Sequence, residues 1–297
     1  MKAVSACAKV LALLSATLVV PTSAQTIAAP DESRSTDAIA CPPMPIVSPS
    51  RMALIVEPRP HIGKIAPASR EDQMNYANWT KIDPYGLCRY REENRSLGRP
   101  SARRVVFIGD SITESWKLAT PSLFTRDVID RGVSGQTTVQ MLARFRQDVI
   151  DLHPAVVHIM GGINDIASPL GTALTRSNIQ SMVDLAQANG ITVILGEITP
   201  SAFFAGAPET KPAPHIVRLN RWLENYAREK RLVLAKYHGG LADRDNGMRD
   251  GLSNDGLHPN RLGFDVMTPL AQAAIDTAFA HRAAAPDRRT ARKTKNN

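Results

Sequence analysis

The sequence predicts a single α/β domain built on a mainly parallel five-stranded sheet, and three observations predict it. From residue 103 onward, short runs rich in Val, Ile and Leu alternate with longer segments in which apolar residues recur at helical spacing. Strands separated by helices pair in parallel, with crossover helices on both faces of the sheet. An apolar share of 43% with 22% charged residues supports a sizeable core and excludes a collagen-like, disulfide-dense or wholly disordered chain.

Five short apolar runs are the expected strands. Each is short enough for a buried parallel strand, and Gly109 stops the first while Gly161 and Gly162 stop the third. The runs cover residues 105–108, 128–130, 155–160, 191–195 and 232–235.

Four segments are expected to form the helices between and after these strands. Apolar residues at 142, 145, 149 and 152 predict a helix that Pro154 ends. Gly190 is a natural residue just past the end of the next helix. The other expected helices cover residues 175–189, 216–230 and 263–280.

The two ends of the chain carry most of its positive charge. The formal net charge is +8, of which residues 1–24 contribute two and residues 281–297 contribute five. The body is therefore nearly neutral, which argues against a nucleic-acid partner. Residues 282–297 are expected to form a basic disordered tail.

The first 24 residues have the features of a signal peptide. Lys2 and Lys9 provide a positive start, residues 10–20 are largely apolar, and residues 22–24 are small. The apolar run is shorter than the roughly 20 residues of a membrane span, so no stable membrane insertion is expected. Because Cys7 precedes the apolar run, a lipoprotein anchor is not indicated. We expect a secreted or periplasmic protein.

Residues 25–70 are expected to be an extended arm or linker, because they hold eight prolines and little periodic apolar content. The folded domain is then expected over residues 71–281. After removal of the signal peptide, Cys41 and Cys88 remain as an even pair in an oxidising compartment. A disulfide and two free thiols are both open at this point.

Four polar segments follow or lie close to strand ends, where sheets of this kind bind their ligands. They are residues 109–111, 132–135, 162–165 and 255–258. A serine hydroxyl needs a base to take its proton, and the base needs an acceptor that fixes its tautomer. Ser111, His258 and Asp255 could fill these roles. The backbone N–H groups of Ser111 and Gly135 and the amide of Asn164 could stabilise an oxyanion.

Neighbouring residues have less specific expectations. Asp110 and Asp165 are expected to brace their loops. Phe203 and Phe204 either line a substrate pocket or pack within a lid loop. The other histidines show no metal-ligand spacing, so no metal is expected and they are interpreted as core or surface residues: His61, His153, His158, His215, His238 and His281.

Two familiar enzyme patterns are absent from the sequence. The nucleophile elbow Gly-x-Ser-x-Gly of α/β-hydrolases would require glycine at position 113, which is threonine. The Gly-x-Gly-x-x-Gly pattern of dinucleotide-binding domains does not follow any expected strand.

Together, the four polar segments resemble the conserved blocks of the GDSL/SGNH hydrolase family, in order and spacing over about residues 103–275. The blocks are Phe-Ile-Gly-Asp-Ser-Ile-Thr-Glu-Ser-Trp at 107–116, Gly-Val-Ser-Gly-Gln-Thr-Thr at 132–138, Gly-Ile-Asn-Asp at 162–165 and Asp-Gly-Leu-His-Pro-Asn at 255–260.

The resemblance implies a flavodoxin-like three-layer α/β/α sandwich and ester hydrolysis without metal or cofactor. It implies Ser111 as nucleophile, His258 as base and Asp255 as the residue that orients it, with Gly135 and Asn164 as oxyanion donors. The sequence departs from the family at Asp130, where many relatives have asparagine before Arg-Gly.

The expected function is that of a secreted serine esterase acting on short acyl groups, such as acetyl, on glycans or small molecules. No long apolar insertion that could line an acyl tunnel separates the four blocks. Two alternatives stay open: a lipase or lysophospholipase, and a catalytically inactive domain that binds a glycan. The oligomeric state is not predicted.

Overall fold

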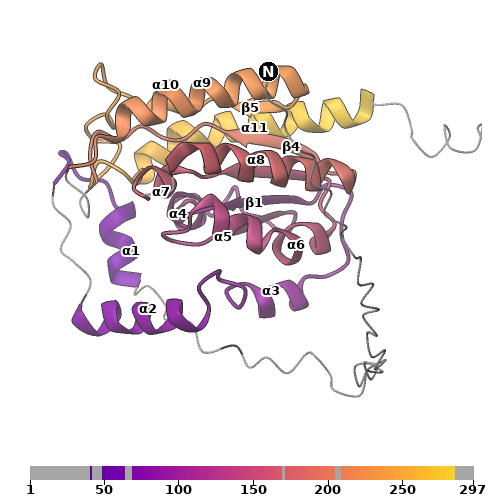
Figure 1. Cartoon of the computed structure of the whole chain (residues 1–297), viewed down its shortest axis with the longest axis horizontal. Helices are drawn as coiled ribbons and strands as arrows, with labels where there is room; N and C mark the ends of the chain where they lie inside the picture. Colours follow the sequence, from indigo (N-terminus) through magenta and orange to yellow (C-terminus); the bar gives the residue numbers. More distant parts are fainter. Residues whose placement is uncertain (1–40, 42–48, 64–68, 169–170, 205–208, 285–297) are drawn as a thin grey trace, which may run out of the picture. The chain divides into compact units, whose positions relative to one another are not determined.

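Five strands form one sheet in the order β2-β1-β3-β4-β5, and every neighbouring pair is parallel. Figure 1 labels β1, β4 and β5 of this sheet among the surrounding helices. Each observed strand begins and ends within two residues of a predicted one, so the five predicted strands are confirmed. They are β1 (Val105–Gly109), β2 (Val128–Gly132), β3 (Val156–Met160), β4 (Thr192–Gly196) and β5 (Val233–Ala235).

This computed structural model describes residues 41, 49–63, 69–168, 171–204 and 209–284, all within one unit that begins at Cys41. The expected signal peptide at 1–24 lies outside the described residues. In the part of the chain that is described, no helix combines the length and apolar character needed to cross a membrane.

The strand order explains where a site can form. The chain passes from β1 to β2 on one side, whereas β3 pairs with the other side of β1, so the loops after β1 and β3 diverge. The register pairs Gly109 at the end of β1 with both Gly132 of β2 and Met160 of β3. Three of the four polar segments therefore begin at the same edge of the sheet.

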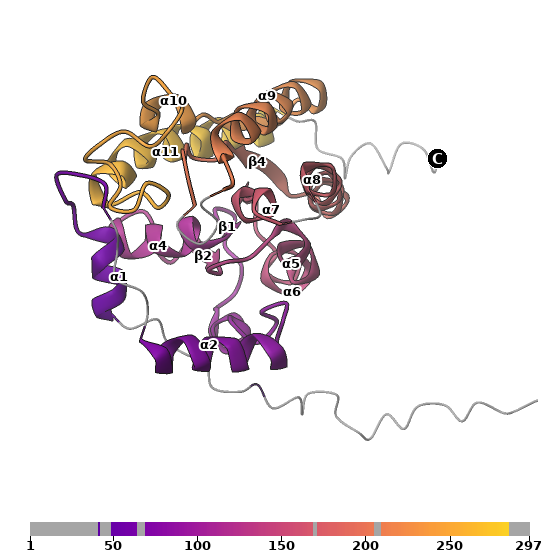
Figure 2. The ribbon, with the colours of Figure 1, turned by 60° about the vertical axis from the view of Figure 1, so that its left-hand side comes forward.

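Helices cover both faces of the sheet, as Figure 2 shows for α4 and α11 on one side and α5 and α8 on the other. The predicted flavodoxin-like three-layer α/β/α sandwich is confirmed. The main helices are α4 (Ser111–Ala119), α5 (Thr138–Ala143), α8 (Gly171–Ala188), α9 (Pro212–Lys230) and α11 (Arg261–Ala284).

The helix predicted over 142–152 is wrong as a continuous element. The structure has α5, then α6 (Phe145–Asp148) and a short 3-10 turn at Ile150–Leu152. The chain turns at Arg144, whose buried guanidinium donates to Gln136 Oε1, Asp148 Oδ2 and the Gly109 carbonyl. Apolar spacing indicates which residues face the core. It does not reveal where a helix is interrupted at a residue whose charged side chain is buried and hydrogen-bonded, as at Arg144.

An aromatic cluster lies in the core beneath the site. His158 stacks on Phe107 with ring centroids 4.3 Å apart, and its Nε2 lies 2.8 Å from the Tyr237 hydroxyl. Burial lowers the pKa of His158 to about 3, so the ring is neutral. Among the two interpretations offered for this histidine, core and surface, the structure places it in the core.

The expectation of an extended arm over 25–70 needs correction where the structure describes it. Helix α1 (Pro49–Val56) forms there, contacts α4 and buries Val56 in the core. Proline suits the first turn of a helix, where its missing N–H would have no partner, so Pro49 begins this helix. Pro58 and Pro60 follow its end. The prolines therefore frame a helix instead of excluding one.

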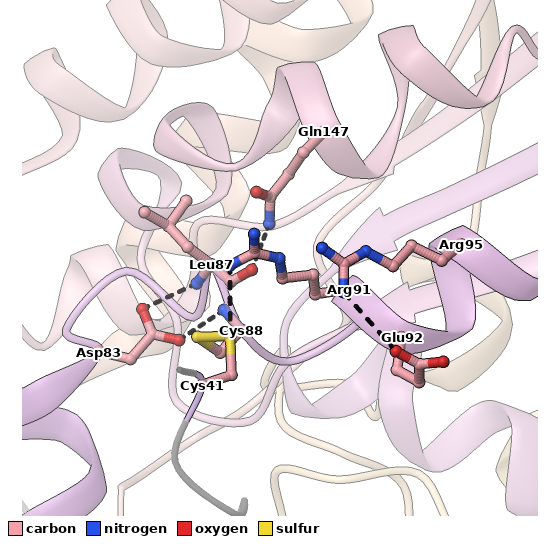
Figure 3. The surroundings of a disulfide bond; sticks show 8 residues. All are labelled: Cys41, Asp83, Leu87, Cys88, Arg91, Glu92, Arg95 and Gln147. Carbon is pink, nitrogen blue, oxygen red and sulfur yellow. Dashed lines mark hydrogen bonds and ion pairs between the residues drawn. A yellow bond between two sulfur atoms is a disulfide. The ribbon is translucent and has the colours of Figure 1, made fainter. Parts of the chain in front are cut away.

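The segment after the arm is joined to residue 41 by a disulfide between Cys41 and Cys88 (Figure 3). Asp83 follows helix α2 (Arg70–Ile82), and its carboxylate accepts from the backbone N–H groups of Leu87 and Cys88 at 2.8 and 2.7 Å. Of the two possibilities left open for these cysteines, the structure contains the disulfide. Helix α3 (Arg91–Ser96) follows.

The C-terminal boundary also differs from the expectation. Helix α11 continues to Ala284, and Arg282 donates to the carbonyls of Gly190 and Ala155 at 2.7 and 3.0 Å. Arg282 is thus part of the domain, because its side chain donates hydrogen bonds to two carbonyls that lie just before β3 and β4. Residues 285–297 of the expected tail lie outside the described residues.

Candidate active site

Ser111 is the first residue of α4, directly after β1. Asp110 caps this helix, because its carboxylate accepts from the Ile112 backbone N–H at 3.0 Å. Burial raises the pKa of Asp110 to about 6, although the Ile112 hydrogen bond and the nearby His258 oppose the rise. The expectation that Asp110 braces its loop agrees with this geometry.

His258 connects Ser111 to Asp255. The Ser111 Oγ lies 2.8 Å from His258 Nε2, and His258 Nδ1 lies 2.7 Å from Asp255 Oδ2. With an ionised Asp255, Nδ1 carries the ring proton and donates it to the carboxylate, which leaves Nε2 free to accept from the serine hydroxyl. The structure therefore brings together the three residues that the sequence proposed as nucleophile, base and orienting acid.

The loop that carries Asp255 is closed by the same carboxylate. Its Oδ1 accepts from the backbone N–H groups of Leu257 and His258 at 2.9 and 2.8 Å. Burial by itself raises the pKa of Asp255, but the His258 side chain and these backbone bonds outweigh it and lower the pKa to about 2. The three-residue spacing thus forms a local turn that keeps the acid ionised.

The second block forms a tight turn over residues 133–136. The Gln136 N–H donates to the Val133 carbonyl at 3.3 Å, and Gly135 has φ +76°, as the third residue of a type II turn requires. The first block packs closely here, because a Cβ on Gly132 would lie 2.1 Å from the Glu114 backbone nitrogen. A glycine is thus needed at each of these two positions.

Asn164 joins the third block to the second. Its side-chain amide donates to the Gln136 carbonyl at 2.9 Å, next to Gly135. An amide nitrogen carries two hydrogens, so this bond fixes the side chain and uses one of them. Asp165 braces the same region, accepting from Thr138 N at 2.9 Å, from Thr138 Oγ1 and from Thr175 Oγ1 at 3.1 Å.

Asp130, the departure from the family pattern, is buried beneath the second block. Its Oδ1 accepts from the Gly132 N–H at 2.8 Å, and its Oδ2 lies 3.4 Å from the Tyr90 hydroxyl. Burial, with the charge of Glu114, raises the pKa of Asp130 to about 7, although the Gly132 hydrogen bond and the charge of Lys117 oppose the rise. A protonated carboxyl has the shape of the amide found in many relatives, which explains how the acid is accommodated.

The two phenylalanines have different environments. Phe204 is buried in the core, whereas Phe203 is 41% exposed. Ring atoms of Phe203 would lie 2.8 Å from a Cβ on Gly256, and Ile62 of the arm approaches the same point at 3.3 Å. Phe203 therefore lies against the loop that carries His258, and Phe204 packs in the core.

Sequence reasoning missed several residues that hold these loops. Glu114 accepts from the backbone N–H and hydroxyl of Ser134 at 2.8 and 2.5 Å. Asn254 donates to the arm carbonyls of Leu54, Ile55 and Glu57. Glu114 lies within the first block and Asn254 directly precedes the fourth, so both could have been considered with them. Tyr76, which donates to the Ser134 carbonyl at 3.0 Å, follows no sequence pattern.

The fold and the site define a class of protein: a hydrolase with a serine, histidine and aspartate at the carboxyl edge of a parallel sheet. Comparison with known families makes the assignment specific. Residues 107–266 match the family described as GDSL-like lipase/acylhydrolase, and the chain belongs to this family. The protein is thus a carboxylic ester hydrolase. In the described part of the chain, no group of three or more His, Cys, Asp or Glu side chains is arranged to hold a metal ion.

Solved structures agree with the assignment. A Bacteroides fragilis NCTC 9343 protein assigned as an acylhydrolase is 41% identical, with a TM-score of 0.63, over 65% of this chain and 97% of its own. A GDSL-like lipase from Bacteroides thetaiotaomicron VPI-5482 is 40% identical, with a TM-score of 0.63, over 65% of this chain and 98% of its own. A search of curated proteins finds no match.

Proposed function

We propose that this protein is an exported serine esterase that works through an acyl-enzyme on Ser111. The observation that carries the proposal is the continuous hydrogen-bonded chain from Ser111 Oγ through His258 to Asp255, with contacts of 2.8 and 2.7 Å. A serine hydroxyl becomes a useful nucleophile only when such a base accepts its proton.

In the proposed reaction, Ser111 Oγ attacks the ester carbonyl carbon while His258 Nε2 takes the hydroxyl proton. The carbonyl electrons move onto oxygen, and the N–H groups of Ser111 and Gly135 and the Asn164 amide stabilise this oxyanion. When the oxyanion collapses, the ester C–O bond breaks and His258 gives its proton to the departing alcohol. Water then attacks the acyl-enzyme by the same steps, releasing the acid and restoring Ser111.

The proposed substrates carry short acyl groups, such as acetyl, on glycans or small molecules. The support is the lack of a long apolar insertion between the four sequence blocks. Export is supported by the signal-like first 24 residues and by the Cys41–Cys88 disulfide, since disulfides persist mainly in oxidising compartments.

A chain-length series of nitrophenyl esters, run beside a panel of acetylated polysaccharides, tests the proposal. We expect the highest kcat/KM with acetyl or butyryl esters and no hydrolysis by Ser111→Ala. A maximum at long acyl chains would instead assign a lipase or lysophospholipase. Wild-type protein that hydrolyses none of these esters but binds a glycan would identify a binding domain.

A further inference from the structure

One peptide unit, between Ser134 and Gly135, is contacted by a side chain that lies 58 residues away in the sequence. Its N–H belongs to Gly135 and is one of the proposed oxyanion donors. Its carbonyl belongs to Ser134 and accepts a hydrogen bond from the Tyr76 hydroxyl at 3.0 Å. Because a trans peptide is planar, whatever fixes the carbonyl direction also fixes the opposite direction of the N–H.

This peptide is the central unit of the turn over residues 133–136. Type I and type II turns differ in the orientation of that central peptide, and glycine as third residue permits the type II form seen here, with φ +76°. Rotation of the peptide to the other form would turn the Gly135 N–H away from its present direction. The direction of this donor therefore depends on contacts made by the Ser134–Gly135 peptide.

Tyr76 is placed to make such a contact from outside the family domain. It lies on α2, well before residue 107, where the family match begins. Trp79 of the same helix is buried, and the segment after α2 is bound by side chains near the turn. Gln136 Nε2 donates to the Tyr85 carbonyl at 2.9 Å, and Gln140 Nε2 donates to the Pro84 carbonyl at 2.8 Å.

We propose that Tyr76 is a positioning residue for the oxyanion hole: its hydroxyl holds the Ser134–Gly135 peptide so that the Gly135 N–H stays directed at the oxyanion. The inference rests on the proposed acyl-enzyme function. Donation to the carbonyl also polarises the peptide and strengthens its N–H as a donor, since linked hydrogen bonds reinforce one another.

Two further observations agree with this role. A Cβ on Gly135 would lie only 3.1 Å from the Tyr76 hydroxyl, so the hydroxyl packs closely against this glycine. Tyr76 is 41% exposed, and the partial burial of its side chain, followed by the charge of Glu114, raises its pKa above the ordinary value, so the hydroxyl keeps its proton and remains a donor at neutral pH.

The test is Tyr76→Phe, which removes the hydroxyl and keeps the ring. Loss of a whole oxyanion donor costs about 10²–10³ in kcat, so loss of one contact that aims the donor should lower kcat by roughly 10-fold. KM should stay unchanged. Because an oxyanion forms in both acylation and deacylation, the loss should be similar for nitrophenyl acetate and for ethyl acetate.

Tyr85→Phe is the matched control. Tyr85 is exposed to a similar extent (45%), and its bond to the turn uses the backbone carbonyl, so this variant should keep the wild-type kcat. An unchanged kcat in Tyr76→Phe would overturn the inference. A change in KM alone, or a loss confined to one leaving group, would also overturn it, because either result would assign Tyr76 to substrate binding. Ser111→Ala distinguishes failure of the proposed function from failure of the inference about Tyr76. If Ser111→Ala stays active, the proposed function itself fails, and the inference fails with it.

Discussion

Asp255 and His258 are three residues apart on one loop, and Asp255 Oδ2 lies 2.7 Å from His258 Nδ1 while Oδ1 accepts the His258 backbone N–H at 2.8 Å. The acid therefore binds both the side chain and the main chain of the same histidine. Two oxygens of one carboxylate fix the ring tautomer and the loop together, so the base is positioned before substrate arrives.

Ser111→Ala and His258→Ala should each reduce turnover of an activated acetyl ester by several orders of magnitude, to a similar floor, because nucleophile and base act as a unit. Asp255→Ala should be milder, since water or a backbone carbonyl can partly hold the imidazole tautomer. Steady-state kinetics measure the order, and fluorophosphonate labelling should disappear in Ser111→Ala. Wild-type turnover by Ser111→Ala would reject the serine mechanism.

Asn164→Ala should lower kcat by about 10²–10³, the usual cost of removing one oxyanion donor. Fluorophosphonate labelling should persist, although more slowly, because Ser111 and His258 remain intact. The rate of labelling and kcat are measured together. A variant with full kcat would exclude Asn164 as an oxyanion donor. The role of Asn164 would then be the structural bond to the Gln136 carbonyl.

Asp130→Asn should stabilise the protein in a pH-dependent way. The folded pKa of Asp130 is raised from 3.8 to about 7, so the folded state holds a proton that the unfolded chain releases between those values. The wild type should therefore lose stability as pH rises from about 4 to about 7, with a constant penalty above. Asparagine cannot ionise and keeps an acceptor for the Gly132 N–H.

The Asp130→Asn measurement is the difference in Tm between variant and wild type at pH 4 and at pH 8. It should be near zero or negative at pH 4 and clearly more positive at pH 8. Asp276→Asn, at an exposed position on α11, is the control and should give the same small difference at both pH values. Equal differences at both pH values for Asp130→Asn would contradict a buried, neutral Asp130.

Mature protein unfolded without reductant should show no reactive thiol, because Cys41 and Cys88 are paired. Reduction should lower Tm, since the bond closes a long loop and a native disulfide typically contributes about 2–5 kcal/mol. A thiol titration and a thermal melt with and without reductant measure both effects. Two thiols per chain before reduction would refute the pairing.

The sequence by itself predicted the strands and the residues that the structure brings together at the candidate active site. Each inner strand of a parallel sheet is buried on both faces, so β1 and β3 are fully buried runs, largely apolar apart from His158, that can be recognised locally. Ser111, Gly135, Asn164 and the Asp255–His258 pair lie in short blocks where the chain makes a special turn. Local chemistry restricts the residue types at such turns, so the pattern is visible without a structure.

Only the tertiary structure decided how the polar surroundings fit together. The break at Arg144, the packing of α1 against α4 and the bond from Tyr76 to Ser134 all depend on partners distant in the sequence; the last spans 58 residues. A buried guanidinium or a hydroxyl bound to a carbonyl produces no periodic pattern in the sequence. A single hydrogen bond constrains one side chain, whereas a buried helix or strand face constrains residues at regular spacing. Such contacts exist only once the folded sheet has brought the two segments together.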